Sequence, residues 1–388
     1  MSKEIVILGC TGSIGDSTFR VLESLGTKYR VRGLSADRQV DKLIELTRVW
    51  NPAVVCVGCE GDVEYVEHQL PGVKVLSGAK GLIELARLEG VDIVVNGLVG
   101  AVGLEPTLAA AEAGRIVAMA NKEPLVMAGG LILDAVHSGG GAILPLDSEP
   151  NAIWQCLQGE PQAQRLILTA SGGAFRGWSM EQMSAVTPQQ ALRHPTWNMG
   201  AKITIDCATL MNKGFEVIEA SWLFDVPIDM IDVIIHRESV VHSMVEFVDG
   251  SMLAHLGKTD MLLPIQYALT HPERSPSPLE RLDLIALGAL HFDEPDWERF
   301  PCLHLCYEAG RRGDTAPTSL NAANEVAVNA FLQERIDFLD IYRVNKETLA
   351  ACSTQPADSI EAVVEADRTA RLYAEAFVDE LVQSPQLV

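Results

Sequence analysis

The chain begins with an order of residues that few folds accommodate: a β-rich apolar run, a glycine-rich turn and a helical stretch. The apolar run is Glu4–Leu8, the turn is Gly9–Gly15, and the helical pattern spans Asp16 to about Leu25. Such glycines allow a tight turn and let backbone N–H groups approach a pyrophosphate, which the helix N-terminus attracts. The spacing is G-x-x-G-x-x-G rather than G-x-G-x-x-G, but the strand–turn–helix context favours a dinucleotide site.

Alternating strand and helix patterns continue to about residue 150. We expect strands at Tyr29–Ser35, Ala53–Val57, Val73–Leu76, Asp92–Asn96, Ile116–Ala120 and Ala142–Leu146, and helices at Lys80–Leu88, Glu105–Ala113 and Leu125–Ser138. This alternation predicts an α/β fold with an N-terminal Rossmann-like parallel sheet that carries helices on both faces.

The end of the second expected strand is where a dinucleotide's ribose is recognised. The segment there is Ala36-Asp37-Arg38-Gln39. An acidic residue would bind the 2′-hydroxyl of NAD, whereas an arginine would pair with the 2′-phosphate of NADP. Both are present, so position alone leaves the cofactor open.

Two carboxylates follow the last strand of this region directly. In Leu144-Pro-Leu-Asp-Ser-Glu-Pro-Asn151, Asp147 and Glu149 are two residues apart. If the segment is extended, both side chains point the same way beyond the strand's carboxyl end, where open α/β sheets bind ligands. Adjacent acids repel one another unless a cation lies between them, and Mg²⁺ or Mn²⁺ would suit these oxygen ligands. A solvated acidic loop is the alternative.

Three further segments are candidates for binding an anionic substrate. Lys122 leaves a strand just before Pro124, which fits the first turn of a helix, so the segment is either a plain helix start or one that presents Lys122 as a cation to substrate or cofactor. Ser171–Arg176 follows the expected strand Arg165–Thr169 and could form a backbone nest for an anion, or a simple flexible turn. His194–Gly200 combines a histidine, a tryptophan, a proline and a glycine, which suits either a mobile lid or a surface loop.

The segment Lys202–Glu216 predicts a short strand that leads into a helix. On that helix, Asn212, Lys213 and Glu216 share one side. A Lys–Glu pair on a helix is most often solvated and contributes little. Because apolar residues surround these polar ones, we instead expect Glu216 to be a third carboxylate of the site, with Asn212 and Lys213 as anion ligands.

The rest of the chain predicts a β-rich region and a helical end. Strands are expected at Met230–Ile235, Ser239–Val248 and Ser251–Leu256, with Asp249-Gly250 as a hairpin turn. A proline-rich linker follows at His271–Pro278, and the pattern is helical from Thr318 onwards.

Composition excludes several classes of protein. The 388 residues are 48% hydrophobic and 21% charged, as in globular enzymes, and the net charge of −22 disfavours nucleic acid or an anionic membrane as partner. No apolar run reaches membrane-spanning length, and the early strand leaves no room for a targeting peptide. A cytoplasmic protein with free or buried thiols is therefore expected, rather than one with disulfides or a zinc site at Cys56/Cys59 or Cys302/His304/Cys306.

These segments together resemble one enzyme family. Gly9–Gly15, Ala120-Asn-Lys-Glu123, Leu146-Asp-Ser-Glu149, Ser171-Gly-Gly173, Arg193-His-Pro-x-Trp-x-Met-Gly200, Met211-Asn-Lys-Gly-x-Glu216 and Ala316-Pro-Thr-x-Leu-Asn-Ala-Ala-Asn-Glu325 occur in this order. The chain is similar, over nearly its whole length, to the 1-deoxy-D-xylulose 5-phosphate reductoisomerases, which rearrange and reduce a ketose phosphate in the non-mevalonate isoprenoid pathway. The resemblance implies NADPH, Mg²⁺ or Mn²⁺ and a homodimer, with the strand region after Met230 at or near the interface.

The resemblance also implies roles for individual residues. NADPH would contact Thr11, Gly12, Ser13, Ile14, Asn121, Glu123 and Gly200, and the ribose segment adds Ala36, Arg38 and Gln39. The metal would be bound by Asp147, Glu149 and Glu216. The substrate would contact Lys122, Ser148, Ser171, His194, Trp197, Cys207, Asn212 and Lys213. The catalytic residues would be Lys122, His194 and the three metal carboxylates, Asp147, Glu149 and Glu216.

The implied domains are an NADPH-binding domain at 1–150, a central α/β catalytic and dimerisation domain at 151–275, a linker at 276–312 and a C-terminal helical bundle at 313–388. Three positions depart from the family's pattern: Asp37-Arg38-Gln39 where a basic segment is usual, Cys207 where a serine is usual, and Pro150 where a histidine is usual. Two other functions remain open on the residues alone. They are a dehydrogenase acting on an amino-acid semialdehyde and a nucleotide-sensing protein without catalysis.

Overall fold

The computed structural model describes residues 2–159, 163–197 and 199–383 and divides the chain into two compact units. The first unit comprises Met1–Pro124, Ile132–Asn151 and Asp260–Glu280. The second comprises Leu125–Leu131, Ala152–Thr259 and Arg281–Val388. Each unit is described separately below.

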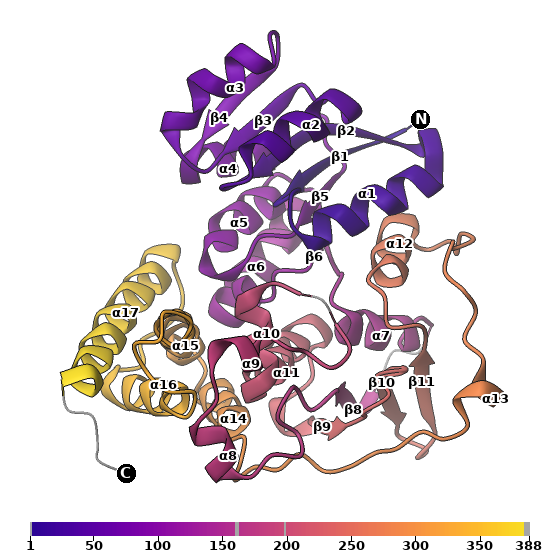
Figure 1. Ribbon diagram of the computed structural model, residues 1–388. Coiled ribbons are helices and arrows are strands. Elements are labelled where there is room, and N and C mark those ends of the chain that lie inside the picture. Colours follow the sequence, from indigo (N-terminus) through magenta and orange to yellow (C-terminus); the bar gives the residue numbers. More distant parts are fainter. Residues whose placement is uncertain (1, 160–162, 198, 384–388) are drawn as a thin grey trace. The chain divides into compact units, whose positions relative to one another are not determined.

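The first unit is built on a seven-stranded parallel sheet with the order β4-β3-β2-β1-β5-β6-β7. The strands are β1 (Lys3–Leu8), β2 (Tyr29–Ala36), β3 (Val54–Val57), β4 (Lys74–Ser77), β5 (Ile93–Asn96), β6 (Ile116–Met119) and β7 (Ala142–Pro145). The helices of this unit are α1 (Ser13–Leu25), α2 (Val40–Trp50), α3 (Val63–Gln69), α4 (Gly78–Ala86), α5 (Leu104–Glu112), α7 (Ser148–Cys156, as far as Asn151) and α12 (Leu262–Thr270). In Figure 1, α1 and α5 lie on opposite sides of β5.

The order of the strands reverses at β1, which pairs with β2 on one side and with β5 on the other. Open parallel sheets bind ligands at such a switch point, beyond the carboxyl ends of the strands. The central strands are apolar and buried, from Ile5–Leu8 in β1 to Ile93–Val95 in β5, because helices cover both faces. The predicted Rossmann-like sheet is therefore confirmed.

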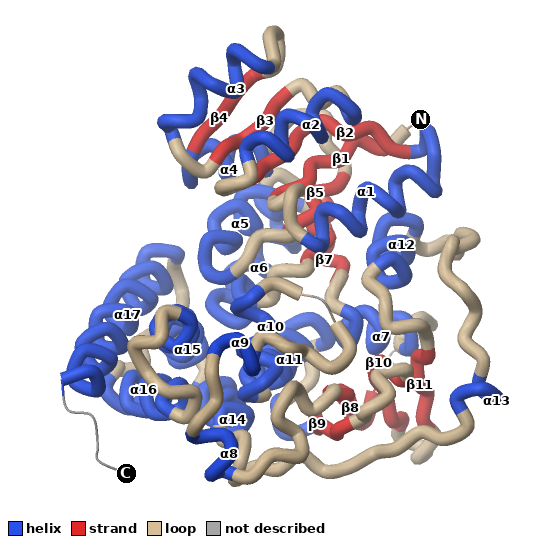
Figure 2. Tube along the Cα trace, viewed as in Figure 1, coloured by secondary structure: helices blue, strands red, loops and turns tan. Residues whose placement is uncertain are grey.

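The second unit contains a four-stranded mixed sheet with the order β11-β10-β8-β9 and most of the helices. Its strands are β8 (Ala163–Ala170), β9 (Ile231–Ile235), β10 (Val241–Phe247) and β11 (Met252–Leu256). Its helices are α8 (Met180–Ser184), α9 (Pro188–Ala191), α10 (Ala201–Thr209), α11 (Met211–Phe224), α13 (Leu284–Leu287), α14 (Cys302–Arg312), α15 (Ala316–Leu332), α16 (Asp340–Ala351) and α17 (Ile360–Gln383). Figure 2 shows these helices in blue and the strands in red.

One apolar core joins this sheet to the C-terminal helices. Leu166 and Leu168 of β8, Ile205 of α10 and Phe331 of α15 are buried in the same cluster. Helices α15, α16 and α17 pack against one another in pairs, which confirms the expected helical bundle at the end of the chain. Helix α6 (Glu123–Gly139) supplies its middle to this unit, where Thr318 of α15 donates a hydrogen bond to the Met127 carbonyl at 2.8 Å.

Most predicted elements are confirmed to within a few residues, including the hairpin of β10 and β11 at Asp249-Gly250. Two local predictions are wrong. Residues 202–206 belong to helix α10 rather than to a strand, and Glu149 lies in the first turn of α7 rather than in an extended segment. Helices α2, α3, α7, α8, α9 and α12 were not predicted, and α13 and α14 fall inside the expected linker 276–312. The bounds of the four expected segments remain predictions.

All eight cysteines lie in the described part of the chain, and none of them is in a disulfide bond there. Cys302 and Cys306 are buried, whereas His304 between them is exposed on the other side of α14, so they do not share a metal site. Within residues 2–159, 163–197 and 199–383, we find no helix with the length and apolar character needed to cross a membrane.

Candidate active site

The glycine-rich turn lies at the switch point of the sheet. Gly9 has φ +75°, and a Cβ there would be 2.6 Å from the carbonyl oxygen of Gly97, which follows β5. A Cβ on Gly15 would be 2.1 Å from the Cys10 carbonyl oxygen. Both positions therefore need glycine, because the backbone segments approach too closely for any side chain.

Helix α1 starts at Ser13, with the exposed Gly12 as its N-cap and no side chain capping it. Its first N–H groups and its dipole are therefore available to an anion such as a pyrophosphate. Burial raises the pKa of the Cys10 thiol in this turn to about 12, so the thiol stays neutral and adds no repelling charge.

The segment expected to bind the ribose is mostly exposed to solvent. Ala36 ends β2 and is buried, whereas Asp37, Arg38 and Gln39 are exposed. The Arg38 and Asp37 side chains are 94% and 80% exposed, and their closest charged atoms are 3.6 Å apart. Such a pair contributes little, so Arg38 can turn toward another anion at small cost.

The polar residues after β6 form a buried group. The Asn121 amide donates to the Gly100 carbonyl at 3.2 Å and to the Glu123 carboxylate at 2.6 Å. Lys122 is only 4% exposed, and its Nζ lies 2.5 Å from Asp147 Oδ2. Glu123 and Pro124 occupy the first turn of α6, as the sequence predicted for the proline.

The two carboxylates after β7 lie at a helix N-terminus. Asp147 immediately precedes α7 and accepts a hydrogen bond from the Ser148 N–H at 3.0 Å. Glu149 is in the first turn and accepts one from the Ser148 hydroxyl. The helix dipole favours negative charge there, so a helix end, not an extended strand, presents these acids. Pro150 also lies in that first turn, where a missing N–H is tolerated, which accounts for a departure that the sequence left unexplained.

In the second unit, the segment after β8 forms the expected small-residue turn. Gly172 and Gly173 have φ values of +83° and +67°, a conformation that residues with a Cβ rarely adopt. The Ser171 hydroxyl oxygen accepts from the Gly173 N–H at 3.2 Å and lies 3.1 Å from His194 Nε2.

The protonation of His194 follows from its other ring nitrogen. His194 Nδ1 accepts from the N–H groups of Thr196 and Trp197 at 3.2 and 2.9 Å. In the neutral ring the proton is therefore on Nε2, which donates to the Ser171 oxygen. In these contacts the Ser171 hydroxyl only accepts, so its proton can be donated to a ligand. Within the expected lid His194–Gly200, residue 198 lies outside the described residues.

Helices α10 and α11 carry the remaining predicted residues. Leu210 joins them in the left-handed conformation at φ +60°. Asn212 donates to Glu216 at 2.6 Å, and Lys213 forms an ion pair with the other oxygen of the same carboxylate. Glu216 is 1% exposed and Lys213 is 4% exposed, so this ion pair is buried rather than part of a solvated face, while the proposed roles of the three residues remain predictions. Cys207 is half-buried on α10.

Sequence reasoning missed Asp206, which lies inside the stretch that it singled out. This carboxylate is 2% exposed and pairs with Lys202 four residues earlier at 2.8 Å. The i,i+4 spacing of Lys202 and Asp206 was the available signal, but the alternation of Ile203 and Ile205 with polar residues predicted a strand instead.

Sequence models of three domains match the chain. They are described as 1-deoxy-D-xylulose 5-phosphate reductoisomerase at residues 5–129, 1-deoxy-D-xylulose 5-phosphate reductoisomerase C-terminal domain at 143–224, and DXP reductoisomerase C-terminal domain at 256–373. The 1-deoxy-D-xylulose 5-phosphate reductoisomerase of Ralstonia nicotianae is 51% identical over 383 residues, covering 96% of this chain and 98% of its own. The chain belongs to the 1-deoxy-D-xylulose 5-phosphate reductoisomerase family.

Other reductoisomerases agree with this assignment. The enzyme of Heliobacterium modesticaldum is 50% identical over 386 residues, covering 98% of both chains. A crystal structure of a DOX-P reductoisomerase in complex with NADPH, fosmidomycin and magnesium has a TM-score of 0.94 and 43% identity, covering 98% of this chain and 99% of that one. The Zymomonas mobilis reductoisomerase in complex with NADPH has a TM-score of 0.91 and 42% identity, covering 98% of this chain and all of that one. The fold predicted from the reductoisomerase resemblance is therefore confirmed over nearly the whole chain.

Proposed function

We propose that this protein converts 1-deoxy-D-xylulose 5-phosphate to 2-C-methyl-D-erythritol 4-phosphate, with NADPH as reductant and Mg²⁺ or Mn²⁺ as the metal. The observation that carries this proposal is the relationship to reductoisomerases over nearly the full chain, at 51% identity over 383 residues with the Ralstonia enzyme. The named side chains support it, because the segments that carry the resemblance lie at the elements described above, with departures at Asp37–Gln39, Pro150 and Cys207.

Most of the residues expected to bind NADPH belong to the first unit. Thr11, Gly12, Ser13 and Ile14 would hold the pyrophosphate at the N-terminus of α1, in the tight turn that requires Gly9 and Gly15. Ala36, Arg38 and Gln39 would contact the ribose and its 2′-phosphate, and Asn121, Glu123 and Gly200 the rest of the cofactor. The buried hydrogen bond of Asn121 with Glu123 would keep both side chains in place.

The donor set also fits a hard divalent ion. Asp147, Glu149 and Glu216 would supply carboxylate oxygens, which Mg²⁺ and Mn²⁺ prefer. The dipole of α7 stabilises the first two acids as anions, and Asn212 and Lys213 do so for Glu216. All three are therefore prepared to bind a cation in their ionised form.

The phosphorylated substrate would be held by donors. Ser171 has a hydroxyl proton to donate, Asn212 and Lys213 supply an amide and an ammonium group, and Cys207 occupies the position where the family usually has a serine. His194 and Trp197 would cover the substrate from the expected lid, and Ser148 would contact it beside the metal carboxylates. Phosphate binding remote from the reacting carbons orients the substrate, which is how its binding energy can promote reaction.

When bound, NADPH supplies the hydride and the divalent ion polarises the substrate oxygens. The Asp147 carboxylate positions Lys122, whose Nζ lies 2.5 Å from Asp147 Oδ2. The Lys122 ammonium group would stabilise negative charge on a substrate hydroxyl or carbonyl oxygen. His194, neutral with its proton on Nε2, would keep Ser171 oriented toward the phosphate.

The assembly and compartment are proposals as well. We place a homodimer interface at β11, an edge strand whose Met252 and Leu253 are each 47% exposed, next to Val248 at 74%. An apolar edge strand of this kind is normally paired or covered. Light scattering after size exclusion would give the mass of a dimer, and Leu253→Lys should shift it to the monomer. We assign the enzyme to the cytoplasm.

The decisive test is NADPH oxidation with 1-deoxy-D-xylulose 5-phosphate, with and without Mg²⁺ or Mn²⁺, together with identification of the product. Oxidation that requires both the sugar phosphate and the metal supports the proposal. Oxidation with an amino-acid semialdehyde in the presence of a chelator would favour the alternative dehydrogenase. NADPH binding without turnover of any substrate would favour a nucleotide-sensing protein.

A further inference from the structure

The motif Ala316–Glu325 belongs to the family resemblance, yet the proposed chemistry gives it no role. Its Asn324 lies on α15, is fully buried, and donates from its amide to Asp206 Oδ1 on α10 at 2.7 Å. The other oxygen of the same carboxylate, Asp206 Oδ2, lies 2.8 Å from Lys202 Nζ. Asp206 thus accepts from one donor on each oxygen, and 118 residues separate it from Asn324.

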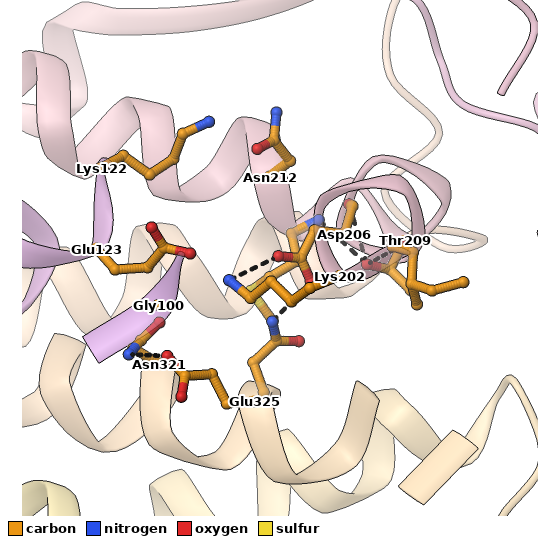
Figure 3. A network of polar contacts seen from close by, with 12 residues as sticks. Gly100, Lys122, Glu123, Lys202, Asp206, Thr209, Asn212, Asn321 and Glu325 are labelled. Atoms are coloured by element: carbon orange, nitrogen blue, oxygen red, sulfur yellow. Dashed lines mark hydrogen bonds and ion pairs between the residues drawn. The ribbon is translucent and has the colours of Figure 1, made fainter. Parts of the chain in front are cut away.

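The orientation of Asn324 is fixed from its other side. Asn345 of α16, also fully buried, donates to the Asn324 side-chain oxygen at 3.1 Å. The Asn324 oxygen therefore faces α16 and its NH₂ group faces α10. Figure 3 shows Lys202 and Asp206 joined on their helix, with Asn321 and Glu325 of α15 across from them. A line of directed hydrogen bonds thus runs from α16 through α15 to α10.

Helix α10 is in direct contact with the substrate side of the site. Asp206 is the neighbour of Cys207, and a Cβ on Gly173 would be 2.4 Å from the Cys207 carbonyl oxygen. The Ser171–Gly173 turn therefore rests on the α10 backbone at this point. Beyond Asp206, the left-handed Leu210 sets the direction of α11, which carries the donors to the phosphate and Glu216.

We propose that Asp206 and Asn324 are positioning residues for the substrate phosphate, a role that rests on the proposed function. The C-terminal helices fix the rotation and axial position of α10 through this carboxylate, and α10 in turn places the Ser171–Gly173 turn and the start of α11. Apolar side chains could hold the helices together as firmly. A carboxylate that accepts two donors from fixed directions also specifies one arrangement of the helices.

The variant Asp206→Asn tests this geometry. Both partners of Asp206 are donors, and an amide has only one oxygen, so one donor must face an NH₂ group. We expect KM for the sugar phosphate to rise at least about tenfold, since displacements of about 1 Å at a site can cost a hundredfold. KM for NADPH should change less than about threefold, because the pyrophosphate site lies on α1. Asn324→Ala should also raise KM for the sugar phosphate, and it replaces Asp206→Asn in this test if that variant does not fold.

The double variant Asp206→Asn with Asn324→Asp again gives each of these hydrogen bonds one donor and one acceptor, with the negative charge moved from position 206 to position 324. The new amide at position 206 can accept from Lys202 with its oxygen and donate with its NH₂ group to the new carboxylate at position 324. That carboxylate can still accept from Asn345. We expect KM for the sugar phosphate to return to within about threefold of the wild type. Ser319→Ala is the matched control, because Ser319 is buried on the same helix but donates to the nearby Thr315 carbonyl at 3.1 Å, and it should affect thermal stability without raising KM.

Amide hydrogen exchange over residues 207–216 gives a readout that does not depend on turnover. Exchange should be faster in Asp206→Asn and should return toward the wild type in the double variant. The inference is overturned if KM and exchange are unchanged in Asp206→Asn, if the double variant is no better than the single one, or if Ser319→Ala raises KM equally. If the wild type does not turn over 1-deoxy-D-xylulose 5-phosphate, the proposed function fails, and exchange alone decides whether the network positions these helices.

Discussion

The variants Glu149→Gln and Glu216→Gln should both abolish turnover, but they should differ in stability. Glu216 is 1% exposed and accepts from Asn212 and Lys213 on separate oxygens. A glutamine carries no charge, so the substitution removes the carboxylate that pairs with the buried Lys213 ammonium. Breaking a buried ion pair costs about 3–5 kcal/mol, so Glu216→Gln should lower the free energy of unfolding by an amount in this range.

Glu149 lies in a different environment. It is half-buried in the first turn of α7, and a glutamine oxygen there can still accept from the Ser148 hydroxyl. We expect Glu149→Gln to lower the free energy of unfolding by less than about 1 kcal/mol, because the side chain is only half-buried and keeps its donor. Both variants should keep NADPH affinity within about threefold, because the glycine turn after β1 is intact.

Three measurements test this pair of variants: NADPH affinity by calorimetry, Mn²⁺ affinity by electron paramagnetic resonance, and unfolding in urea. Loss of Mn²⁺ binding in both, with a stability loss in Glu216→Gln alone, is the expected result. A large loss of NADPH affinity in both variants would refute the assignment of these acids to the metal. Equal stability losses would refute the argument that the deeper burial of Glu216 and its pairing with Lys213 make it the more important of the two for stability.

Three further predictions concern single residues. Arg38→Ala should narrow the NADPH:NADH ratio of kcat/KM, because this exposed guanidinium can turn to pair with a 2′-phosphate; an unchanged ratio would show that it does not read the phosphate. Cys207→Ser should lower KM for the sugar phosphate by up to about tenfold without changing KM for NADPH, since a hydroxyl is a stronger donor than a thiol; an unchanged or higher KM would contradict this. Burial raises the pKa of Glu238, but hydrogen bonds from the His291 side chain and backbone outweigh it and lower the pKa to about 2. The ionised Glu238 carboxylate contributes its full stabilisation above about pH 4.5, and this stabilisation is lost as the pH falls toward 2. Glu238→Gln should therefore reduce the dependence of the free energy of unfolding on pH between these values, and an unchanged dependence would exclude this contribution.

The first half of the fold could be predicted because local and long-range signals agree there. Each strand of the parallel sheet is a short apolar run between glycine turns and helices, so the hydrophobic pattern and the turn residues that bound it predict the same structure. The pairing of Lys122 with Asp147 follows from the same pattern. These residues leave β6 and β7, which are adjacent and parallel, so their carboxyl ends meet at one edge of the sheet.

The wrong predictions occur where a tertiary contact overrides the local pattern. Lys202-Ile-Thr-Ile-Asp206 alternates polar and β-branched residues, which is typical of a strand. In the helix that forms instead, Lys202 reaches Asp206 at i,i+4, and the hydrogen bond from Asn324 satisfies the rest of that buried carboxylate. No window of sequence around residue 206 contains Asn324, so the local pattern could not reveal the partner that decides the structure.

The same reasoning separates two kinds of polar residue in the chain. The candidate ligands occur in short motifs, because the chemistry needs several donors or acceptors on one turn, as with Asn212, Lys213 and Glu216. The residues that hold those motifs in place come from distant helices, and only the donors and acceptors of their hydrogen bonds identify them. Asp206 accepts twice, and Asn324 donates to it and accepts from Asn345. A substitution that keeps size but reverses one donor, as Asp206→Asn does, should therefore disturb substrate binding although it touches no proposed ligand. A substitution that reverses both partners together should not.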